Sequence, residues 1–284
     1  MITHPNVKIN IGLNVLRKRP DGYHDIETLF YPCHDTCDVL EIIAGDDYSR
    51  TSAGLFGRYG ADDTLRQGIS EDGKLMITIA RAEGVDWNPA EDLCARAYRL
   101  LDKDFGLPPV KIFLEKLSPV GAGLGGGSAD AAFTLRMLSE MFSLGTDDST
   151  LAEYASRLGS DCAFFIHDRP MFGEGRGEIL SPCDFSDLSD YDIKIISPEG
   201  ISVSTAEAYG GIEPGIPDIP LREILMRPVS EWKDRLKNDF EKTVFPRHPA
   251  LAAIKQSLYD SGAVYASMSG SGSSLFAIYP AAGK

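Results

Sequence analysis

The stretch PVGAGLGGGSADAA, residues 119–132, places five glycines in the seven positions from Gly121 to Gly127. Glycine lets the backbone adopt left-handed conformations and lets another group approach it closely. An alternating, strand-like run at 110–116 leads into this loop, and a run with helical spacing follows it. Strand, glycine loop and helix together are typical of an anion site, because unpaired N–H groups converge on a phosphate. The stretch therefore predicts a phosphate-binding loop.

Two common nucleotide motifs do not describe this loop. It contains GxGxxG at Gly121, Gly123 and Gly126, which is the dinucleotide fingerprint of an oxidoreductase. The strand before it is not the first of the chain, however, and no acidic residue ends a strand about 20 residues later. No Lys-Ser or Lys-Thr pair follows the last glycine, so the loop is not of the Walker type either.

The composition predicts a folded protein of one large or two modest domains, with 284 residues, 43% of them hydrophobic and 25% charged. The formal charge of −14 disfavours a nucleic-acid partner, because phosphate backbones need a basic face, but it leaves nucleotides possible. No signal peptide and no membrane span are expected from the residue pattern. Five scattered cysteines without a CxxC pair favour reduced thiols and a cytoplasmic location.

Strands and helices alternate without a regular βαβ period, which predicts an α+β fold. Alternation over residues 7–16 predicts a half-buried strand with Lys8 and Asn10 on its less apolar face. Ser128 is expected to cap the helix after the glycine loop, with Asp130 in its first turn. Further strands are expected at 26–32, 38–44, 74–80, 110–116 and 191–198, and helices at 91–104, 149–158 and 248–261. A C-terminal hairpin is expected at 263–279, loops or a hairpin at 45–73, and a loop that contains STAEAY at 204–209.

Two further motifs accompany the glycine loop, HPNVKINIGL at 4–13 and SMSGSGSSLFAI at 267–278. In this order and spacing, the three motifs resemble those of the GHMP kinase superfamily, which includes galacto-, homoserine, mevalonate and phosphomevalonate kinases. The resemblance spans essentially the whole chain. It implies an ATP-binding N-terminal domain at 1–175 that is ribosomal protein S5 domain 2-like. It also implies a ferredoxin-like C-terminal domain at 176–284 that contributes to the substrate site.

Three segments give a narrower resemblance within the superfamily: RPDGYHDIETLF at 19–30, GSDCAFFI at 159–166 and GEGRGEIL at 173–180. They are similar to members of non-mevalonate isoprenoid biosynthesis that use ATP to phosphorylate the 2-hydroxyl of a cytidine diphosphate-linked methylerythritol. One alternative is a member that acts on another small alcohol, such as mevalonate or homoserine, and DGYH disfavours it. Another is a catalytically inactive member that serves as a binding module, which the presence of Lys8 and Asp161 disfavours.

The resemblance assigns the chemistry to two side chains. Asp161 would accept the hydroxyl proton, and Lys8 would hold the carboxylate and the incoming hydroxyl while stabilising the developing negative charge. The alternative for Asp161 is a helix cap, and for Lys8 a surface position on the strand. Asn10 is expected to hydrogen-bond the substrate.

An aromatic ring can stack on a pyrimidine, and a neighbouring imidazole can bond its edge. By resemblance Tyr23 and His24 bind the cytosine, and Tyr209 covers its other face. The alternative is a tyrosine and a histidine that serve only the core.

The resemblance also implies ATP and Mg²⁺ as cofactors. The expected ATP-binding residues are Pro119, Val120, Gly121, Ala122, Gly123, Leu124, Gly125, Gly126, Gly127 and Ser128. Ser128 would contact a phosphate or its magnesium ion, or serve only as the helix cap. One position departs from the family, because Asp92 stands where an asparagine usually helps to hold the adenine side. The adenine contacts are therefore left unassigned. The sequence assigns neither metal ligands nor an oligomeric state.

Overall fold

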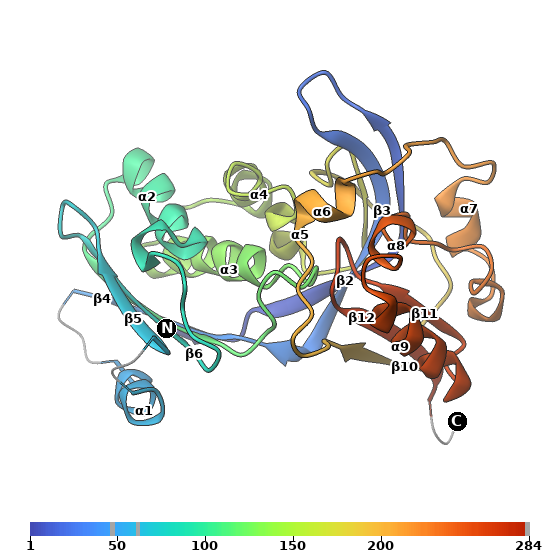
Figure 1. Cartoon of the computed structure of the whole chain (residues 1–284). Coiled ribbons are helices and arrows are strands. Elements are labelled where there is room, and N and C mark those ends of the chain that lie inside the picture. The colour runs from blue at the N-terminus through green and yellow to red at the C-terminus, as the bar shows by residue number, and fades with distance from the viewer. Residues whose placement is uncertain (46–48, 61–62, 282–284) are drawn as a thin grey trace. The chain divides into compact units, whose positions relative to one another are not determined.

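The structure is a computed structural model that describes residues 1–45, 49–60 and 63–281 (Figure 1). The chain forms two compact units that interleave along the sequence. Unit 1 comprises Met1–Val7, Cys33–Val120 and Gly125–Asp168, and unit 2 comprises Lys8–Pro32, Gly121–Leu124 and Arg169–Lys284. The predicted domain division at residue 175 stays a prediction.

Unit 1 contains a five-stranded sheet with the strand order β1-β4-β7-β6-β5. Its strands are β1 (Ile2–Thr3), β4 (Val39–Ala44), β5 (Leu65–Ile69), β6 (Leu75–Arg81) and β7 (Val110–Lys116). Neighbouring strands are antiparallel except β6 and β7, which are parallel. Alternate residues such as Ile42, Ile77 and Ile112 are fully buried, as expected for a sheet face covered by helices. Figure 1 shows α2 and α3 over this face.

The helices of unit 1 are α1 (Ser52–Arg58), η1 (Pro89–Glu91), α2 (Leu93–Phe105), α3 (Gly126–Met141), α4 (Asp148–Ser156) and α5 (Cys162–His167). Helix α2 ends where Gly106 adopts a left-handed conformation with φ +65°. The expectation of loops or a hairpin at 45–73 is partly wrong. β5 does form a hairpin with β6, but α1 also lies in this range, and residues 46–48 and 61–62 are outside the described chain.

Helix α1 was missed because it has one buried side chain and no apolar period. Leu55 packs against Ile43, Ala80 and Phe113 on the sheet face opposite to α2 and α3. A single anchor residue among glycines does not produce the spacing that predicts an amphipathic helix. Within the described residues, no helix is long and apolar enough to cross a membrane.

Unit 2 contains two sheets. One has the strand order β2-β3-β8-β9. Its strands are β2 (Asn6–Lys18), β3 (His24–Cys37), β8 (Met171–Glu174) and β9 (Ile179–Ser181). Strand β2 begins in unit 1, and β3 ends in it. The other has the order β10-β12-β11, from β10 (Tyr191–Ile196), β11 (Tyr265–Met268) and β12 (Leu275–Pro280). The predicted C-terminal hairpin is confirmed, with Tyr265 paired to Ile278.

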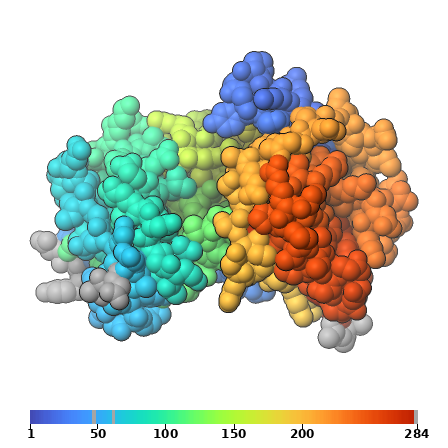
Figure 2. Space-filling view, viewed as in Figure 1, coloured from blue at the N-terminus to red at the C-terminus, as the bar shows by residue number. Residues whose placement is uncertain are grey.

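The helices of unit 2 are α6 (Thr205–Tyr209), α7 (Leu221–Leu225), η2 (Val229–Glu231), α8 (Glu241–Val244) and α9 (Pro249–Asp260). Helix α9 packs on the C-terminal hairpin, and Leu251 is its fully buried residue. Figure 2 accordingly shows α9 on the visible surface of its unit. The segment of α6 was expected to be a loop, but Ser204 Oγ accepts the Glu207 N–H at 3.1 Å and begins a short helix there.

Candidate active site

Lys8 and Asn10 lie on β2 within unit 2, and both are buried. Lys8 is 4% exposed and Asn10 2% exposed, so the expectation of an open polar strand face is wrong. The physical reason is that the carbonyl of Gly123 and the turn at Ser269 cover this face within the same unit. Lys8 Nζ donates hydrogen bonds to Asn10 Oδ1 at 2.6 Å and to the Gly123 carbonyl at 2.8 Å. The ammonium is thus oriented by neighbouring oxygens.

The three sequence motifs meet in unit 2 through Ser269. Its hydroxyl accepts a hydrogen bond from the Asn10 N–H at 3.3 Å and donates one to the Gly123 carbonyl at 3.0 Å. Asn238 holds the C-terminal turn from behind, donating from Nδ2 to the carbonyls of Met268 at 2.7 Å and Gly270 at 2.9 Å. The sequence analysis missed Asn238, because no local pattern marks a residue whose partners lie about thirty positions away.

Several glycines of the loop are explained by the backbone conformation and the packing of the protein itself. Gly121, Gly123 and Gly125 have φ values of +69°, +79° and +73°, a region that side chains disfavour. A Cβ on Gly123 would overlap the Ser269 carbonyl oxygen and lie 3.0 Å from the Gly272 nitrogen. The C-terminal glycine turn is therefore a support for the loop within unit 2.

Gly126 and Gly127 are the first two residues of helix α3 in unit 1, and they differ in the space available for a side chain. A Cβ on Gly126 would lie 2.5 Å from Ser118 Oγ, so this position also makes room for the protein's own atoms. Among the described residues, a Cβ on Gly127 would meet Leu93 alone, at an ordinary contact distance of 3.7 Å, and the residue is exposed. Packing against the described residues therefore does not require a glycine at position 127.

Helix α3 begins differently from the prediction. Gly125 occupies the N-cap position in a left-handed conformation, and no side chain of the described residues caps the helix there. The expectation that Ser128 caps the helix is wrong, because it is the third helical residue. Asp130 is buried beyond the first turn, so its expected place near the dipole is also wrong. The uncapped N–H groups at this helix start are suited to an anion.

Ser128 instead points to Asp161, also in unit 1. Its hydroxyl donates to Asp161 Oδ1 at 2.7 Å. Asp161 stands at the N-cap position of α5, but its side chain makes no capping hydrogen bond, which removes the helix-cap alternative. Next to it, burial raises the pKa of the Cys162 thiol to about 12, so this thiol stays neutral. Lys8 and Asp161 belong to different units, and their pairing stays a prediction.

The residues expected to bind the base lie in unit 2. Tyr23 is 56% exposed, and the Arg176 guanidinium lies 5.0 Å from its ring centroid. The rings of His24 and Tyr209 stack at 4.6 Å with an interplanar angle of 20°. Burial, together with the charge of Lys18, lowers the pKa of His24, so its ring is neutral near pH 7. A neutral imidazole offers one donor and one acceptor to a ligand.

Helix α6 is tied down around Tyr209. The Tyr209 ring meets the Phe240 ring edge-on at 4.7 Å, and Arg247 donates to the carbonyls of Glu207 at 3.0 Å and Gly210 at 2.8 Å. Thr243 Oγ1 donates to the Ala208 carbonyl at 2.6 Å. The ring that stacks on His24 is thus fixed by its surroundings.

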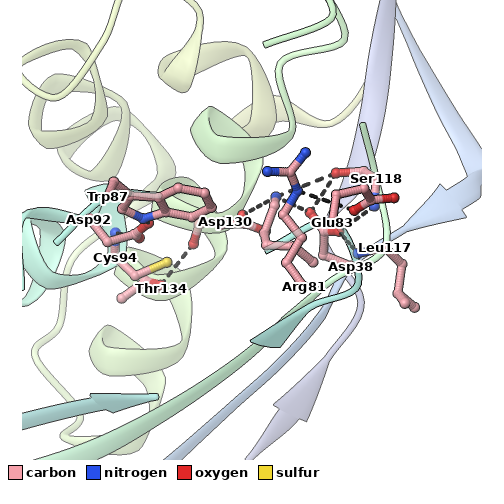
Figure 3. A network of polar contacts seen from close by, with 11 residues as sticks. Asp38, Arg81, Glu83, Trp87, Asp92, Cys94, Leu117, Ser118, Asp130 and Thr134 are labelled. Atoms are coloured by element: carbon pink, nitrogen blue, oxygen red, sulfur yellow. Dashed lines mark hydrogen bonds and ion pairs between the residues drawn. The ribbon is translucent and has the colours of Figure 1, made fainter. Parts of the chain in front are cut away.

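Asp92, the position that departs from the family, caps helix α2. Its Oδ1 accepts the Cys94 N–H at 2.9 Å and its Oδ2 accepts the Trp87 indole N–H at 3.0 Å (Figure 3). Both carboxylate oxygens therefore serve the fold. Among the described residues, no group of three or more His, Cys, Asp and Glu side chains is placed to hold a metal ion.

Comparison with known proteins identifies the family of the chain. Residues 92–169 match the family described as "GHMP kinases N terminal domain", and residues 222–284 match "GHMP kinases C terminal". A protein from Bacteroides fragilis is 47% identical over 98% of this chain and 92% of its own length. The chain belongs to the GHMP kinase family, and it is accordingly an enzyme, an ATP-dependent phosphotransferase.

That relative is called 4-diphosphocytidyl-2-C-methyl-D-erythritol kinase, and so is a protein from Cytophaga hutchinsonii, 41% identical over 98% of this chain and 92% of its own. A crystal structure of 4-(cytidine 5'-diphospho)-2C-methyl-D-erythritol kinase is 29% identical, with a TM-score of 0.72 over 100% of this chain and 91% of that one. A homoserine kinase from Cytophaga hutchinsonii, 16% identical over 98% and 86% with a TM-score of 0.64, shares the fold. The predicted two-domain α+β GHMP kinase fold is confirmed.

The two kinds of glycine in the loop can be separated by thermal unfolding. Gly123→Ala should lower the unfolding midpoint clearly, because its Cβ meets backbone that cannot move aside at a positive φ. Gly127→Ala should leave the midpoint unchanged or raise it, since alanine in a helix is favoured over glycine by roughly 0.5–1 kcal/mol. Equal midpoints for the two variants would contradict this division.

Proposed function

We propose that this kinase transfers the γ-phosphate of ATP to the 2-hydroxyl of 4-diphosphocytidyl-2-C-methyl-D-erythritol. The observation that carries the proposal is the 47% identity, over nearly the full length of both chains, to a kinase named for that substrate. The hairpin that presents Tyr23 and the stacked pair of His24 and Tyr209 support it, because they offer aromatic and polar groups to a pyrimidine. The reaction would belong to non-mevalonate isoprenoid biosynthesis, and the cytoplasmic location expected from the sequence stays a prediction.

On the base side, Tyr23 would stack on the cytosine with its exposed ring. One face of that ring already lies near Arg176, so the base would use the other face. His24, neutral and held against Tyr209, would hydrogen-bond the edge of the base. In this arrangement Tyr209 acts partly by holding the imidazole in place.

On the nucleotide side, residues 119–128 would enclose the phosphates of ATP. Two observations support this placement. The N–H groups at the start of α3 have no side-chain cap among the described residues, and Gly127 is exposed, with space around it for a ligand. Mg²⁺ usually binds nucleotide phosphates together with one or two protein oxygens. Ser128 Oγ, in the first turn of α3, is an oxygen donor of that kind, so the residues present fit the ion. Bound there, Mg²⁺ would neutralise charge on the phosphates.

For the transfer itself, Asp161 would accept the proton of the substrate hydroxyl. A bond forms between that oxygen and the γ-phosphorus, and the bond from phosphorus to the β–γ bridging oxygen breaks, releasing ADP. Ser128 holds the Asp161 carboxylate in orientation by its hydrogen bond. Lys8, oriented by Asn10 and the Gly123 carbonyl, would supply positive charge for the attacking oxygen. The assignment of both residues rests on the family resemblance.

A turnover assay tests the proposed substrate. Purified protein with ATP and Mg²⁺ should phosphorylate 4-diphosphocytidyl-2-C-methyl-D-erythritol, detected as ADP release and as the product mass. Mevalonate and homoserine, the substrates of kinases that share the fold, should give no turnover above background. Turnover of either one without turnover of the cytidine compound would refute the proposal.

Loss of the base-binding groups should act mainly on substrate affinity. Base stacking is worth about 1–3 kcal/mol, so Tyr23→Ala should raise the KM of the cytidine substrate roughly ten- to a hundredfold, with a smaller change in kcat. His24→Ala should behave in the same way, and Tyr154→Ala, a partly exposed tyrosine of α4, serves as the control. An unchanged KM in Tyr23→Ala would exclude stacking on this ring.

The catalytic pair is tested by a double-mutant cycle. Asp161→Asn keeps the shape but removes the proton acceptor, so kcat should fall about 10²–10⁴-fold, while ATP affinity changes little. Lys8→Met should also lower kcat. The fold-decrease in kcat of the double variant should be much smaller than the product of the two single fold-decreases. The control is Asp148→Asn, which removes a surface carboxylate in unit 1, the unit that contains Asp161. Additive losses would show that the two residues act separately.

A further inference from the structure

A buried charged cluster in unit 1 has no part in the proposed phosphoryl transfer. It consists of Asp38 just before β4, Lys116 at the end of β7, Ser118, and Asp130 on α3, and we call it the anchor cluster. Figure 3 labels Asp38, Ser118 and Asp130. The side chains of Lys116, Asp38 and Asp130 are 4%, 1% and 2% exposed. Lys116 Nζ bridges the two carboxylates. Charges buried to this degree are costly unless each is paired.

The anchor cluster holds the chain where it enters the glycine loop. Asp38 Oδ1 accepts the N–H groups of Leu117 and Ser118, each at 2.7 Å. Its Oδ2 accepts the Ser118 hydroxyl at 2.7 Å and an ammonium hydrogen of Lys116. Leu117 and Ser118 immediately precede Pro119, the first residue of the loop. One carboxylate thus sets the direction in which the backbone leaves the sheet, through charge-assisted hydrogen bonds.

The same cluster supports the place where the chain leaves the loop. Gly126 is the first residue of α3, and a Cβ there would lie 2.5 Å from Ser118 Oγ and 3.3 Å from Lys116 Nζ. Lys116 Nζ also donates to Asp130 Oδ2 at 2.6 Å, one turn further along α3. The entry and the exit of the loop therefore rest on one ammonium group and one hydroxyl.

Burial and the neighbouring charges shift the pKa of two groups in the anchor cluster, Asp130 and Lys116. Burial raises the pKa of Asp130 well above its usual range, although Lys116 acts in the opposite direction. Its Oδ1 has no hydrogen-bond partner among the described residues. Burial alone would lower the pKa of Lys116, but the two carboxylates raise it above its usual value. Among the described residues, the Asp130 carboxyl accepts one hydrogen bond, from Lys116, whereas the Asp38 carboxyl accepts four.

We propose that Asp38 is the positioning residue of the phosphate loop, and that through Lys116 and Ser118 it holds both ends of the loop in the conformation that binds ATP. The inference rests on the proposed ATP site. Asp38 acts on the nucleotide through the loop backbone and does not touch the phosphates. The Asp130 carboxyl accepts one hydrogen bond, from Lys116, and an amide oxygen can accept it too, so asparagine can replace Asp130 more easily than it can replace Asp38.

The test compares two Asp→Asn variants of the full chain by calorimetric titration with Mg-ATP. In Asp38→Asn, the amide NH₂ faces donors, because both carboxylate oxygens accept hydrogen bonds from the backbone, Ser118 and Lys116. Affinity for ATP should fall about 10- to 100-fold, as for lost hydrogen bonds to a charged group, with a smaller change in kcat at saturating ATP. Asp130→Asn should weaken ATP binding by less than about threefold, since the amide oxygen can accept the hydrogen bond from Lys116.

Asp102→Asn is the control, because it breaks a Lys74–Asp102 ion pair of 2.8 Å in the same unit, outside the anchor cluster. Wild-type protein that does not bind ATP would refute the proposed function itself. If wild type binds ATP, then unchanged affinity in Asp38→Asn, or equal losses in the Asp38 and Asp130 variants, would overturn the inference. Should Asp38→Asn not fold, Ser118→Ala should weaken ATP binding about 2- to 10-fold at a near-normal unfolding midpoint, and wild-type affinity there would overturn it.

Discussion

The backbone of Gly123 lies so close to the Ser269 carbonyl that no side chain fits between them, and the arrangement of unit 2 around β2 depends on this contact. The Gly123 carbonyl can then accept hydrogen bonds from both Lys8 and Ser269. Asn238 fixes the turn from its other side. A buried lysine needs such oxygen partners, because an unpaired ammonium away from water is strongly unfavourable. The close approach of two backbones thus determines where the Lys8 ammonium lies.

The fold does not by itself select the substrate. The homoserine kinase from Cytophaga hutchinsonii shares it at 16% identity. Function on a shared fold resides in the side chains of a particular site. In this chain, the groups proposed to select the substrate are the exposed Tyr23 and the stacked rings of His24 and Tyr209. Aromatic surface at that position suits a nucleobase better than a small aliphatic alcohol.

Most regular elements follow from local patterns in the sequence. The strands β2, β4, β6, β7 and β10 lie where alternation predicts them, and α2, α4 and α9 where helical spacing or end signals do. The errors have local physical causes. Helices α1 and α6 are too short to show a period, and the start of α3 depends on Gly125 in a left-handed conformation instead of a capping side chain.

The sequence by itself determined the element types, the phosphate-loop motif, the class of enzyme it resembles and the residue types available for its chemistry. These features are encoded within short windows, where side-chain period and glycine content act directly on the backbone. Only the tertiary structure decided which glycines make room for the protein's own atoms, that Lys8 is buried, and that Asp38 hydrogen-bonds the residues just before the loop. Asp38 meets Ser118 across 80 residues, and Ser269 meets Gly123 across 146. Such pairings arise from the packing of distant segments, which no local pattern encodes.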